Sequence, residues 1–388
     1  MLERCLPAIL LSVCLAASPV AFAAASLDPA SVAAALSSVQ ADAESPADII
    51  RDNPLIHELA GERGAVLLDE PDEPDYVSKD PEPITPPPTH ALRIVLDWYV
   101  NPYHAALIVA RERGLFDRLG LDVTLSPPAD PSVPPKLVAA GRAELALVSE
   151  PSLHRLVDQG LSLIRVGTLI PLPLSGVLVR DDAGIDSVAD LEGKTIGYAV
   201  EGPARVYLDA LFAHQPFGLD AVTLQPVDFG LGQALAGGKV DAIVGPLRPL
   251  ERDGLAEQGV ATHELEIEDG TLPLYDALTV VANRDTLSRH RRDIAHFMNA
   301  VEEAMVWIVR HPQAAWTLIS QAEPALDTPE NARAWPTLLP YFALRPGLLQ
   351  VERYRRFEHY LYRRGLVGQV TPLASLAVDV TAPETPSP

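Results

Sequence analysis

Cysteine is almost absent from this 388-residue chain, and its two copies, Cys5 and Cys14, both lie close to the N-terminus. If the N-terminal segment is removed after export, the mature chain has no disulfide, no thiolate nucleophile and no cysteine-based zinc site. Basic residues are also few, with 30 Lys and Arg against 52 Asp and Glu and a formal net charge of −22. A polyanion gains little from such a surface, so we expect no nucleic-acid partner.

Several motifs of enzymes and metalloproteins are absent too. None of the ten histidines belongs to an HExxH motif, and the chain has no Walker-type, GxGxxG or GxSxG motif. These motifs hold catalytic zinc, nucleotide phosphates and a nucleophilic serine. We therefore expect no metal centre and no other cofactor, and the sequence supports no Ser–His–Asp catalytic set.

The first 23 residues have the pattern of a secretory signal peptide. Arg4 precedes an apolar run, residues 6–18, which Pro19 ends before the small-x-small sequence Ala21-Phe-Ala23. Because a membrane-spanning helix needs about 20 apolar residues, the shorter run predicts an exported, periplasmic protein that is cleaved near Ala23. No later segment of the sequence is long enough to span a bilayer.

Lipid attachment is an alternative fate for the same segment. A lipoprotein form would use Cys14 as its lipidated residue, but bulky Val13 stands where such a signal has a small residue. We therefore expect cleavage without lipidation.

The next stretch of the chain is poor in apolar residues. From Asp69 to Pro88 the sequence reads DEPDEPDYVSKDPEPITPPP, with seven acidic residues, seven prolines and one lysine. It cannot bury a core, so we expect an extended tether that its charge stiffens. Residues 24–90 as a whole are predicted to be an N-terminal extension, and residues 371–388 a flexible tail.

Between residues 91 and 370, short apolar runs alternate with helical stretches, as is typical of an α/β protein with parallel sheets. The expected strands are residues 92–98, 121–125, 145–148, 162–169, 176–179, 195–198, 223–226, 240–244 and 277–282. The expected helices are residues 105–115, 133–141, 204–213, 232–236 and 289–309, a short turn or helix at 188–191, and the remainder to 366.

These elements form two α/β series with a returning strand, which predicts two lobes. We place lobe 1 at residues 91–180 and 272–370 and lobe 2 at residues 181–271. Ligands of such sheets bind beyond the carboxyl ends of the strands, in the cleft between the lobes. Polar and aromatic residues in the strand-to-helix loops are therefore the candidates for ligand contact.

The first such loop carries the sequence Asp97-Trp98-Tyr-Val-Asn101-Pro-Tyr-His104. Its aromatic side chains, Trp98 among them, suit stacking on a flat ring. Asp97 and Asn101 suit hydrogen bonds to ring nitrogens and an exocyclic amine, and His104 is a further candidate. The alternative is that Asn101 caps a helix and Trp98 belongs to the core.

The second lobe repeats the arrangement at Tyr198, Glu201, Gly202, Ala204 and Arg205. The glycine permits tight backbone geometry, and the proline that follows it suits a first helical position. Free amides at a helix start attract anionic or electron-rich groups. The alternative is an ordinary tight turn.

Five more residues complete the candidate set. Ser149 and Glu150 end the third expected strand, and Tyr275 and Asp276 precede the returning strand near the expected hinge. Either pair could close over a ligand, and either could instead cap a loop. Ser175, ahead of the strand at 176–179, is the fifth.

Five segments between Leu92 and Leu366 together resemble a known family. They are LDWYVNPYHAALIVARERGLFDRLGLDVTL, AAGRAELALVS, LEGKTIGYAVEGPARVYLDAL, ALAGGKVDAIVG and VERYRRFEHYLYRRGLV. The resemblance is to the family that unites periplasmic substrate-binding proteins of ABC importers with the thiamine-pyrimidine synthases. It implies the type II periplasmic-binding-protein fold, in which two crossovers join two α/β lobes around a ligand cleft.

The resemblance also implies a ligand class. In members with a DWxxNPxH loop the ligand is a thiamine pyrimidine precursor, such as a formylated or free aminomethylpyrimidine, whereas other branches bind sulfonates, nitrate or flavin precursors. In this chain Asp97 and Glu150 favour amine donors, and Arg205 is the one obvious cation for an anionic ligand. The residues thus favour the pyrimidine.

The synthase branch is similar in the same segments, but it makes the pyrimidine from pyridoxal phosphate and a histidine of its own chain. By the resemblance, its cofactor lysine matches Val148 and its sacrificial histidine matches Ser152. His154 is two residues displaced from that position. The cysteine-rich metal motif of the synthases is missing as well.

We therefore expect an exported, monomeric solute-binding protein, not an enzyme, that closes its lobes on a small heteroaromatic molecule and delivers it to an ABC transporter permease. Two alternatives remain open, a thiamine-pyrimidine synthase and a sensory input protein of a membrane receptor. A lysine imine with pyridoxal phosphate would identify the synthase. Neighbouring permease and ATPase genes would separate transport from sensing.

Overall fold

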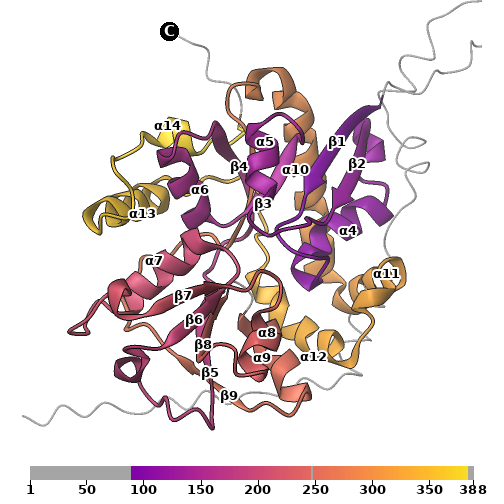
Figure 1. Cartoon of the computed structure of the whole chain (residues 1–388). Coiled ribbons are helices and arrows are strands. Elements are labelled where there is room, and N and C mark those ends of the chain that lie inside the picture. Colours follow the sequence, from indigo (N-terminus) through magenta and orange to yellow (C-terminus); the bar gives the residue numbers. More distant parts are fainter. Residues whose placement is uncertain (1–88, 246–247, 383–388) are drawn as a thin grey trace, which may run out of the picture. The chain divides into compact units, whose positions relative to one another are not determined.

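The computed structural model describes residues 89–245 and 248–382, with only the backbone of residues 248–250. The expected signal peptide and acidic tether lie outside the described residues. All described residues belong to one compact unit. In it the chain forms two five-stranded mixed sheets with helices packed against them (Figure 1), which confirms the expected α/β class.

The first sheet has the strand order β2-β1-β3-β10-β4. Strands β1 (His90–Val95), β2 (Leu121–Ser126) and β3 (Leu145–Val148) are parallel. The returning strand β10 (Leu278–Asn283) runs antiparallel between β3 and β4 (Leu163–Ile170). All four residues of β3 are buried, because it lies inside the sheet and is covered on both faces.

The second sheet repeats this plan in the order β7-β6-β8-β5-β9. Strands β6 (Thr195–Tyr198), β7 (Thr223–Pro226) and β8 (Ala242–Gly245) are parallel. Strand β5 (Gly176–Arg180) runs antiparallel to β8 and to β9 (Thr262–Leu265). Each sheet therefore contains one strand that the chain inserts after crossing from the other sheet.

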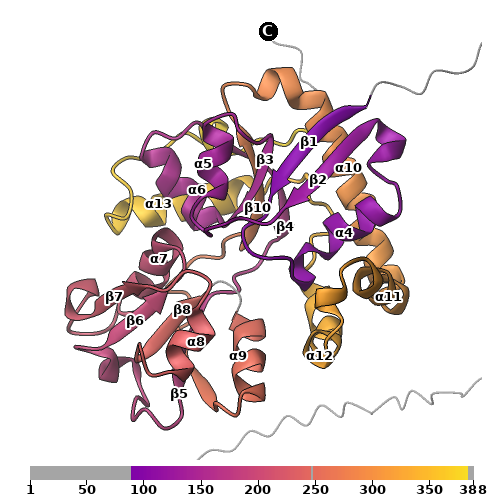
Figure 2. The same ribbon diagram turned by 45° about the vertical axis from the view of Figure 1, so that its right-hand side comes forward.

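The chain passes between the sheets twice, through residues 171–175 and residues 266–277. We call these segments the first and the second crossover. Lobe 1 denotes residues 89–170 and 278–382, and lobe 2 denotes residues 176–265. Figure 2 shows the first sheet above the second sheet.

The helices connect the strands or cover the sheets. They are α4 (Ala105–Glu112), α5 (Pro134–Ala139), α6 (Glu150–Asp158), α7 (Glu201–Leu211), α8 (Leu231–Ala236), α9 (Arg248–Glu257), α10 (Leu287–Arg310), α11 (Pro312–Ala322), α12 (Pro329–Leu338), α13 (Val351–Arg363) and α14 (Leu373–Leu376). The short 3-10 helices are η1 (Pro102–His104), η2 (Asp117–Leu119), η3 (Val188–Leu191), η4 (Leu219–Ala221), η5 (Pro324–Leu326) and η6 (Leu339–Tyr341).

Helix α10 shows why the sequence pattern predicted a long helix. Its residues Ile294, Phe297, Val301 and Ile308 are buried, at the three- and four-residue spacing of one helical face. The ring of Phe297 stacks on Phe116 at 5.2 Å between centroids. Within the two described ranges, no helix is both long enough and apolar enough to cross a membrane.

Three elements differ from the sequence-based expectation. Helix α6 was not expected, because Ser149 and Glu150 were taken as the end of a strand. The Oγ atom of Ser149 instead accepts a hydrogen bond from the Ser152 amide at 3.4 Å and caps the helix. Helix α9 and strand β9 were also missed; α9 is rich in charged residues and contains Gly254, which weakens the helical signal.

The C-terminal residues also differ from expectation. Residues 371–382 were expected to be part of a flexible tail, but they include α14, and Leu376, Ala377 and Val380 are buried. Ala377 forms an isolated parallel bridge with Arg165 of β4. The prediction was wrong for these residues because their apolar side chains are few and irregularly spaced, so no period marked them as core.

Candidate ligand-binding site

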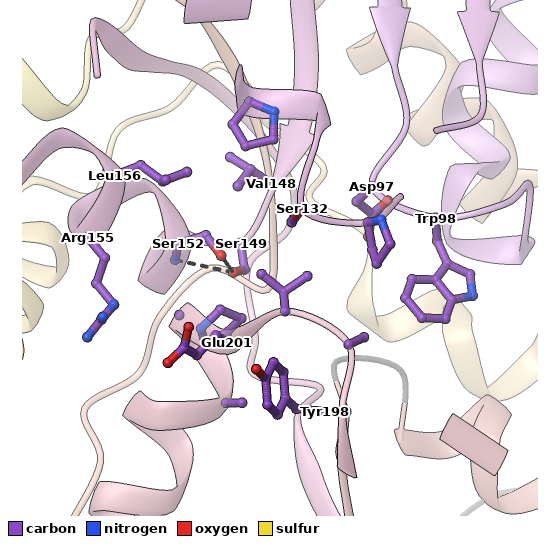
Figure 3. Close-up of a pocket in the computed structure, with 18 of the residues that line it drawn as sticks. Asp97, Trp98, Ser132, Val148, Ser149, Ser152, Arg155, Leu156, Tyr198 and Glu201 are labelled. Atoms are coloured by element: carbon purple, nitrogen blue, oxygen red, sulfur yellow. Dashed lines mark hydrogen bonds between the residues drawn. The ribbon is translucent and has the colours of Figure 1, made fainter. Parts of the chain in front are cut away.

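A pocket of about 390 Å³ lies between the two lobes (Figure 3). Lobe 1 supplies the loops after β1, β2 and β3 and one face of α6, and lobe 2 supplies the turn between β6 and α7, the loop after β7 and the end of β8. Each crossover adds one residue, Ser175 and Ala277. The pocket thus lies at the carboxyl ends of parallel strands, as expected for this sheet topology.

Eight of the fourteen candidate residues line this pocket. They are Asp97, Trp98, Ser149, Ser175, Tyr198, Glu201, Gly202 and Ala204. The other six, which do not line it, are Asn101, His104, Glu150, Arg205, Tyr275 and Asp276. The structure therefore brings together residues that lie about 100 positions apart in the sequence, and their contact with a ligand stays a prediction.

Asn101 and His104 stabilise the first loop by hydrogen bonds but do not line the pocket. The Asn101 side chain accepts a hydrogen bond from the Tyr103 amide at 2.9 Å, which begins η1. The Asn101 amide donates to Nδ1 of His104 at 3.2 Å, so that nitrogen is the acceptor and Nε2 carries the proton. Asn101 therefore caps a helix, which is the alternative stated for it above.

The proton on Nε2 of His104 is directed at Asp97. The distance from Nε2 to Oδ1 of Asp97 is 2.9 Å, and the His104 side chain is buried while that of Asp97 is 20% exposed. This contact fixes the carboxyl group and leaves its second oxygen for the pocket. His104, expected as a ligand contact, thus orients a residue that lines the pocket.

Trp98 belongs to both the pocket and the core. It is only 2% exposed, and its ring makes a T-shaped contact with Phe229 from lobe 2 at 4.7 Å between centroids. Tyr99 also approaches Phe229, at 5.9 Å, but is 53% exposed. The aromatic loop of lobe 1 therefore packs across the cleft on a lobe 2 side chain that the sequence did not single out.

The start of α6 forms the middle of the pocket wall. Ser149 donates its hydroxyl proton to the Oγ of Ser152 at 3.0 Å, and Val148 stands beside them (Figure 3). Val148 and Ser152 are the positions that, by the resemblance, hold a lysine and a histidine in the synthases. Neither side chain can form an imine or donate a ring to the pyrimidine.

The turn after β6 brings lobe 2 to the pocket. Glu201 begins α7 and accepts a hydrogen bond from Nε of Arg205 at 2.6 Å, which turns Arg205 away from the pocket lining. A Cβ atom on Gly202 would lie 3.6 Å from Cδ of Arg155, so this glycine marks a close approach of the two lobes. Burial raises the pKa of Tyr198, and the nearby Glu201 carboxylate adds to the effect.

Several charged lining residues were missed from the sequence. They are Asp130, Lys136, Arg155 and Asp228. Asp228 and Asp130 follow strands β7 and β2, so the strand-to-helix rule used for Asp97 would have found them. Asp228 also has a φ of +47°, a left-handed conformation that few non-glycine residues adopt and that is enriched near functional sites.

The described lining is more acidic than basic. Asp97, Asp130, Glu201 and Asp228 face two cations. Lys136 donates to the Ser132 hydroxyl at 3.2 Å and lies near Asp130, while burial and the charge of Arg205 lower the pKa of Arg155. An excess of carboxylates favours a neutral or basic ligand that donates hydrogen bonds.

Glu150 and Asp276 do not reach the pocket, because they lie buried behind it. Oε2 of Glu150 accepts the Asp276 amide proton at 2.7 Å. Oδ2 of Asp276 accepts hydrogen bonds from Thr168 at 2.6 Å and from the Tyr354 hydroxyl at 3.0 Å. Tyr275 is buried beside Phe357 at 5.4 Å between ring centroids. These three predicted contacts serve the structure of the second crossover.

His154 completes this buried cluster. Its Nε2 atom lies 3.3 Å from Glu150, and its Nδ1 atom lies 2.5 Å from Oε2 of Glu358. Burial opposes the charged ring, but the two carboxylates outweigh it and raise the pKa of His154 to about 9. Burial raises the pKa of Glu150 as well. In the described part of the chain, no group of three or more His, Cys, Asp or Glu side chains is arranged to hold a metal ion.

Comparison with known proteins identifies relatives over most of the described chain. The family described as NMT1/THI5 like matches residues 101–315. A Haemophilus influenzae protein named for thiamine biosynthesis is 37% identical over 293 residues, which cover 74% of this chain and 92% of that protein. A formylaminopyrimidine-binding protein of Halalkalibacterium halodurans is 30% identical over 228 residues, 59% of this chain and 69% of that protein.

Enzymes occur among the relatives as well. A 4-amino-5-hydroxymethyl-2-methylpyrimidine phosphate synthase of Uromyces fabae is 26% identical over 295 residues, 72% of this chain and 85% of the enzyme. The relatives of this chain therefore include both proteins named for binding and proteins named for synthesis.

Solved structures share the fold at low sequence identity. The alkanesulfonate-binding protein SsuA of Xanthomonas axonopodis pv. citri has a TM-score of 0.62 at 16% identity, covering 75% of this chain and 99% of that one. The ligand-binding component of an ABC-type import system from Staphylococcus aureus has a TM-score of 0.58 at 9% identity, covering 76% and 98%. The chain thus has the type II periplasmic-binding-protein fold, and it belongs to the NMT1/THI5-like family.

Proposed function

We propose that this protein is an exported solute-binding protein of an ABC importer and that its ligand is a thiamine pyrimidine precursor. The fold and the relatives named for binding support a binding role. The observation that carries the proposal is the oriented Asp97 carboxylate, which enters a pocket between two lobes beside the rings of Trp98 and Tyr198.

The ligand class follows from what these groups can recognise. An aminopyrimidine presents a flat ring for aromatic contact and an exocyclic amine that donates hydrogen bonds. Asp97 is an acceptor with one oxygen already bound to His104, so its second oxygen suits such a donor. A formylated or free aminomethylpyrimidine fits this description.

A sulfonate or nitrate would meet a less favourable pocket. The lining holds four carboxylates against Lys136 and Arg155, and each of these cations has an acidic residue nearby. The electrostatic potential of the pocket would therefore disfavour the binding of an anion. The likeness to a sulfonate-binding protein extends to the fold and gives no support for a sulfonate ligand.

The synthase is the second candidate, because several relatives carry that name. Two pocket positions argue against it. Val148 and Ser152 line the pocket where the resemblance implies the cofactor lysine and the sacrificial histidine, and His154 is sealed between Glu150 and Glu358. Among the described lining residues Lys136 is the single lysine, and it lies on α5, which precedes β3 in the chain, and not directly after β3 as the cofactor lysine would.

Transport is the role that suits a binding protein of this fold. Closure of two lobes around a ligand would create a shape that an inner-membrane permease can recognise. We propose a monomeric receptor in the periplasm as the form that performs this role.

Titration calorimetry on the full chain tests the proposal. We expect saturable binding of formylaminopyrimidine and no binding of an alkanesulfonate or nitrate under the same conditions. Incubation with pyridoxal phosphate should give no imine absorbance and no pyrimidine product. Tight binding of the sulfonate alone would overturn the ligand, and a single-turnover pyrimidine product would overturn the binding role.

A further inference from the structure

Helix α13 begins at the place where the chain crosses between the lobes. Nη1 of Arg353 donates to the carbonyl oxygen of Pro171, in the first crossover, at 2.6 Å. The same nitrogen donates to Oδ1 of Asp276, in the second crossover, at 2.5 Å. One guanidinium group in the first turn of α13 therefore ties both crossovers together.

The body of α13 packs on the rest of lobe 1. Glu358 binds His154 of α6, and the ring of Phe357 meets the same histidine at 5.4 Å. Just beyond the helix, the carbonyl oxygen of Leu366 accepts a hydrogen bond from Nη1 of Arg155 at 3.2 Å. Helix α13 is thus fixed to the helix that forms one wall of the pocket.

The C-terminal end of α13 reaches lobe 2. Arg364, the residue after the helix, donates from Nε to Oδ2 of Asp209 at 2.7 Å and from Nη2 to Oδ1 at 3.1 Å. The hydrogen bond to Asp209 raises the pKa of Arg364 although burial opposes it. In addition to the ion pair between Arg364 and Asp209, Val206 of α7 belongs to the same buried hydrophobic cluster as Tyr360 and Leu361 of α13.

Asp209 lies on the same helix as several residues of the pocket lining. Glu201, Gly202 and Ala204 line the pocket at the start of α7, and Asp209 follows about one and a half turns after Ala204. Because a short helix moves as a rigid body, a contact at Asp209 also sets the position of the residues at the pocket.

We propose that Arg364 and Asp209 are a positioning pair that raises ligand affinity without touching the ligand. The pair holds α7 against lobe 1 in the arrangement that closes the pocket, while Arg353 holds the crossovers on which the lobes turn. This inference rests on the proposed function for its ligand, but the positions of α13 and α7 carry it independently of ligand identity. When fewer molecules are in the arrangement that can bind the ligand, the apparent affinity is lower in proportion.

Four variants of the full chain test the proposal. Arg364→Gln and Asp209→Asn each remove one side of the pair, and the double variant Arg364→Asp with Asp209→Arg restores it with reversed charges. Arg118→Gln is the matched control. Arg118 and Glu303 form a more exposed, single-contact ion pair, at 2.8 Å, that lies wholly within lobe 1 and does not join the lobes.

Two measurements decide the outcome. For formylaminopyrimidine we expect Kd to rise roughly three- to tenfold in each single variant, as for a partly exposed charge pair that shifts a closure equilibrium. The control should stay within about twofold, and the double variant should recover most of the loss. In ligand-free protein, amide hydrogen exchange of α7 and the crossovers should be faster in Arg364→Gln than in the wild type and the control.

The two readouts separate this inference from the proposed function. If the wild type does not bind formylaminopyrimidine, the ligand assignment fails, and hydrogen exchange alone tests the positioning pair. Unchanged exchange in α7 of Arg364→Gln would overturn the positioning role. So would equal losses of affinity in Arg364→Gln and in the Arg118→Gln control.

Discussion

Two clusters of acidic residues with a histidine lie near the pocket, one around Asp97 and one around Glu150 and Asp276, and they differ in access to it. Asp97 is held by His104 and keeps one side open to the cavity. Glu150 and Asp276 are buried together, and His154 is enclosed with them. The same residue types therefore line the pocket in one place, where we propose that they recognise the ligand, and form a structural joint in the other.

The difference comes from the elements that carry the residues. Asp97 stands in an irregular loop, where one partner orients it and the rest of the group remains free. Glu150 stands in the first turn of α6, and its carboxylate accepts the amide of the second crossover. A buried carboxylate needs such partners, because burial of an unpaired charge is costly. We call Asp97 and His104 the open cluster, and Glu150, Asp276 and His154 the sealed cluster. The predictions below test the contrast between the two clusters.

The largest expected effect is the loss of stability in Asp276→Ala. This change leaves Arg353, Tyr354 and Thr168 without their common acceptor, so we expect the free energy of unfolding to fall by about 3–5 kcal/mol, as for a broken buried pair. Urea unfolding followed by circular dichroism measures it. Asp97→Asn is the control, because the amide oxygen can still accept the His104 proton, and it should lose less than about 1 kcal/mol. Equal losses in both variants would contradict the contrast.

The sealed cluster should also make stability depend on pH. The pKa of His154 is about 9 in the folded protein against 6.5 ordinarily, so the folded state holds this proton more tightly. The resulting stabilisation is complete below pH 6.5 and is lost as the pH rises through 9. We expect about 3 kcal/mol of unfolding free energy to disappear between pH 6.5 and 9.5.

Urea unfolding of the wild type and of His154→Gln at these two pH values measures this effect. The glutamine cannot titrate, so its change over the same range should be smaller by most of that amount. If the free energy of unfolding changes equally with pH in the two proteins, His154 does not hold its proton more tightly in the folded state.

Asp97→Asn should weaken pyrimidine binding although it leaves the fold stable. It replaces a charged acceptor by a neutral one, so we expect a loss of about 1.5–3 kcal/mol in the binding free energy of formylaminopyrimidine. Calorimetry measures the loss. Asp122→Asn, an exposed aspartate of β2 outside the pocket lining, is the control and should bind as the wild type does. Undiminished affinity in Asp97→Asn would remove Asp97 from the recognition of the ligand.

The smallest expected effect is that of Lys136→Gln. This lysine lines the pocket, but it is exposed and already donates to Ser132, so its removal should change the Kd of a neutral pyrimidine by less than about twofold. The same titration measures it. A tenfold loss would instead indicate that the ligand carries a negative group at this end of the pocket.

Much of the fold follows from local patterns. The strands at 145–148, 195–198 and 223–226 match β3, β6 and β7 residue for residue. For β3 the reason is a short, fully buried apolar run between turn signals, which marks a strand clearly. Helix α9 and strand β9 were missed because charged residues and a glycine interrupt their periods. Tertiary contacts rather than local preference stabilise such elements.

The site was predictable in outline and not in detail. The strand-to-helix loops directed attention to Asp97, Trp98, Tyr198 and Glu201, all of which line the pocket, and their contact with a ligand stays a prediction. The same rule did not separate them from Arg205, which pairs with Glu201 on its own helix.

The amino-acid pattern was sufficient to establish an α/β chain with a returning strand and polar loops at the strand ends, because periodicity and turn residues act over a few positions. Only the packed molecule decided which acids face the cavity and which are sealed at the crossovers. That choice depends on side-chain direction and on partners more than 100 residues away, such as Asp276 for Glu150 and Glu358 for His154. A linear pattern carries no such distances, so they become visible only when the two lobes come together.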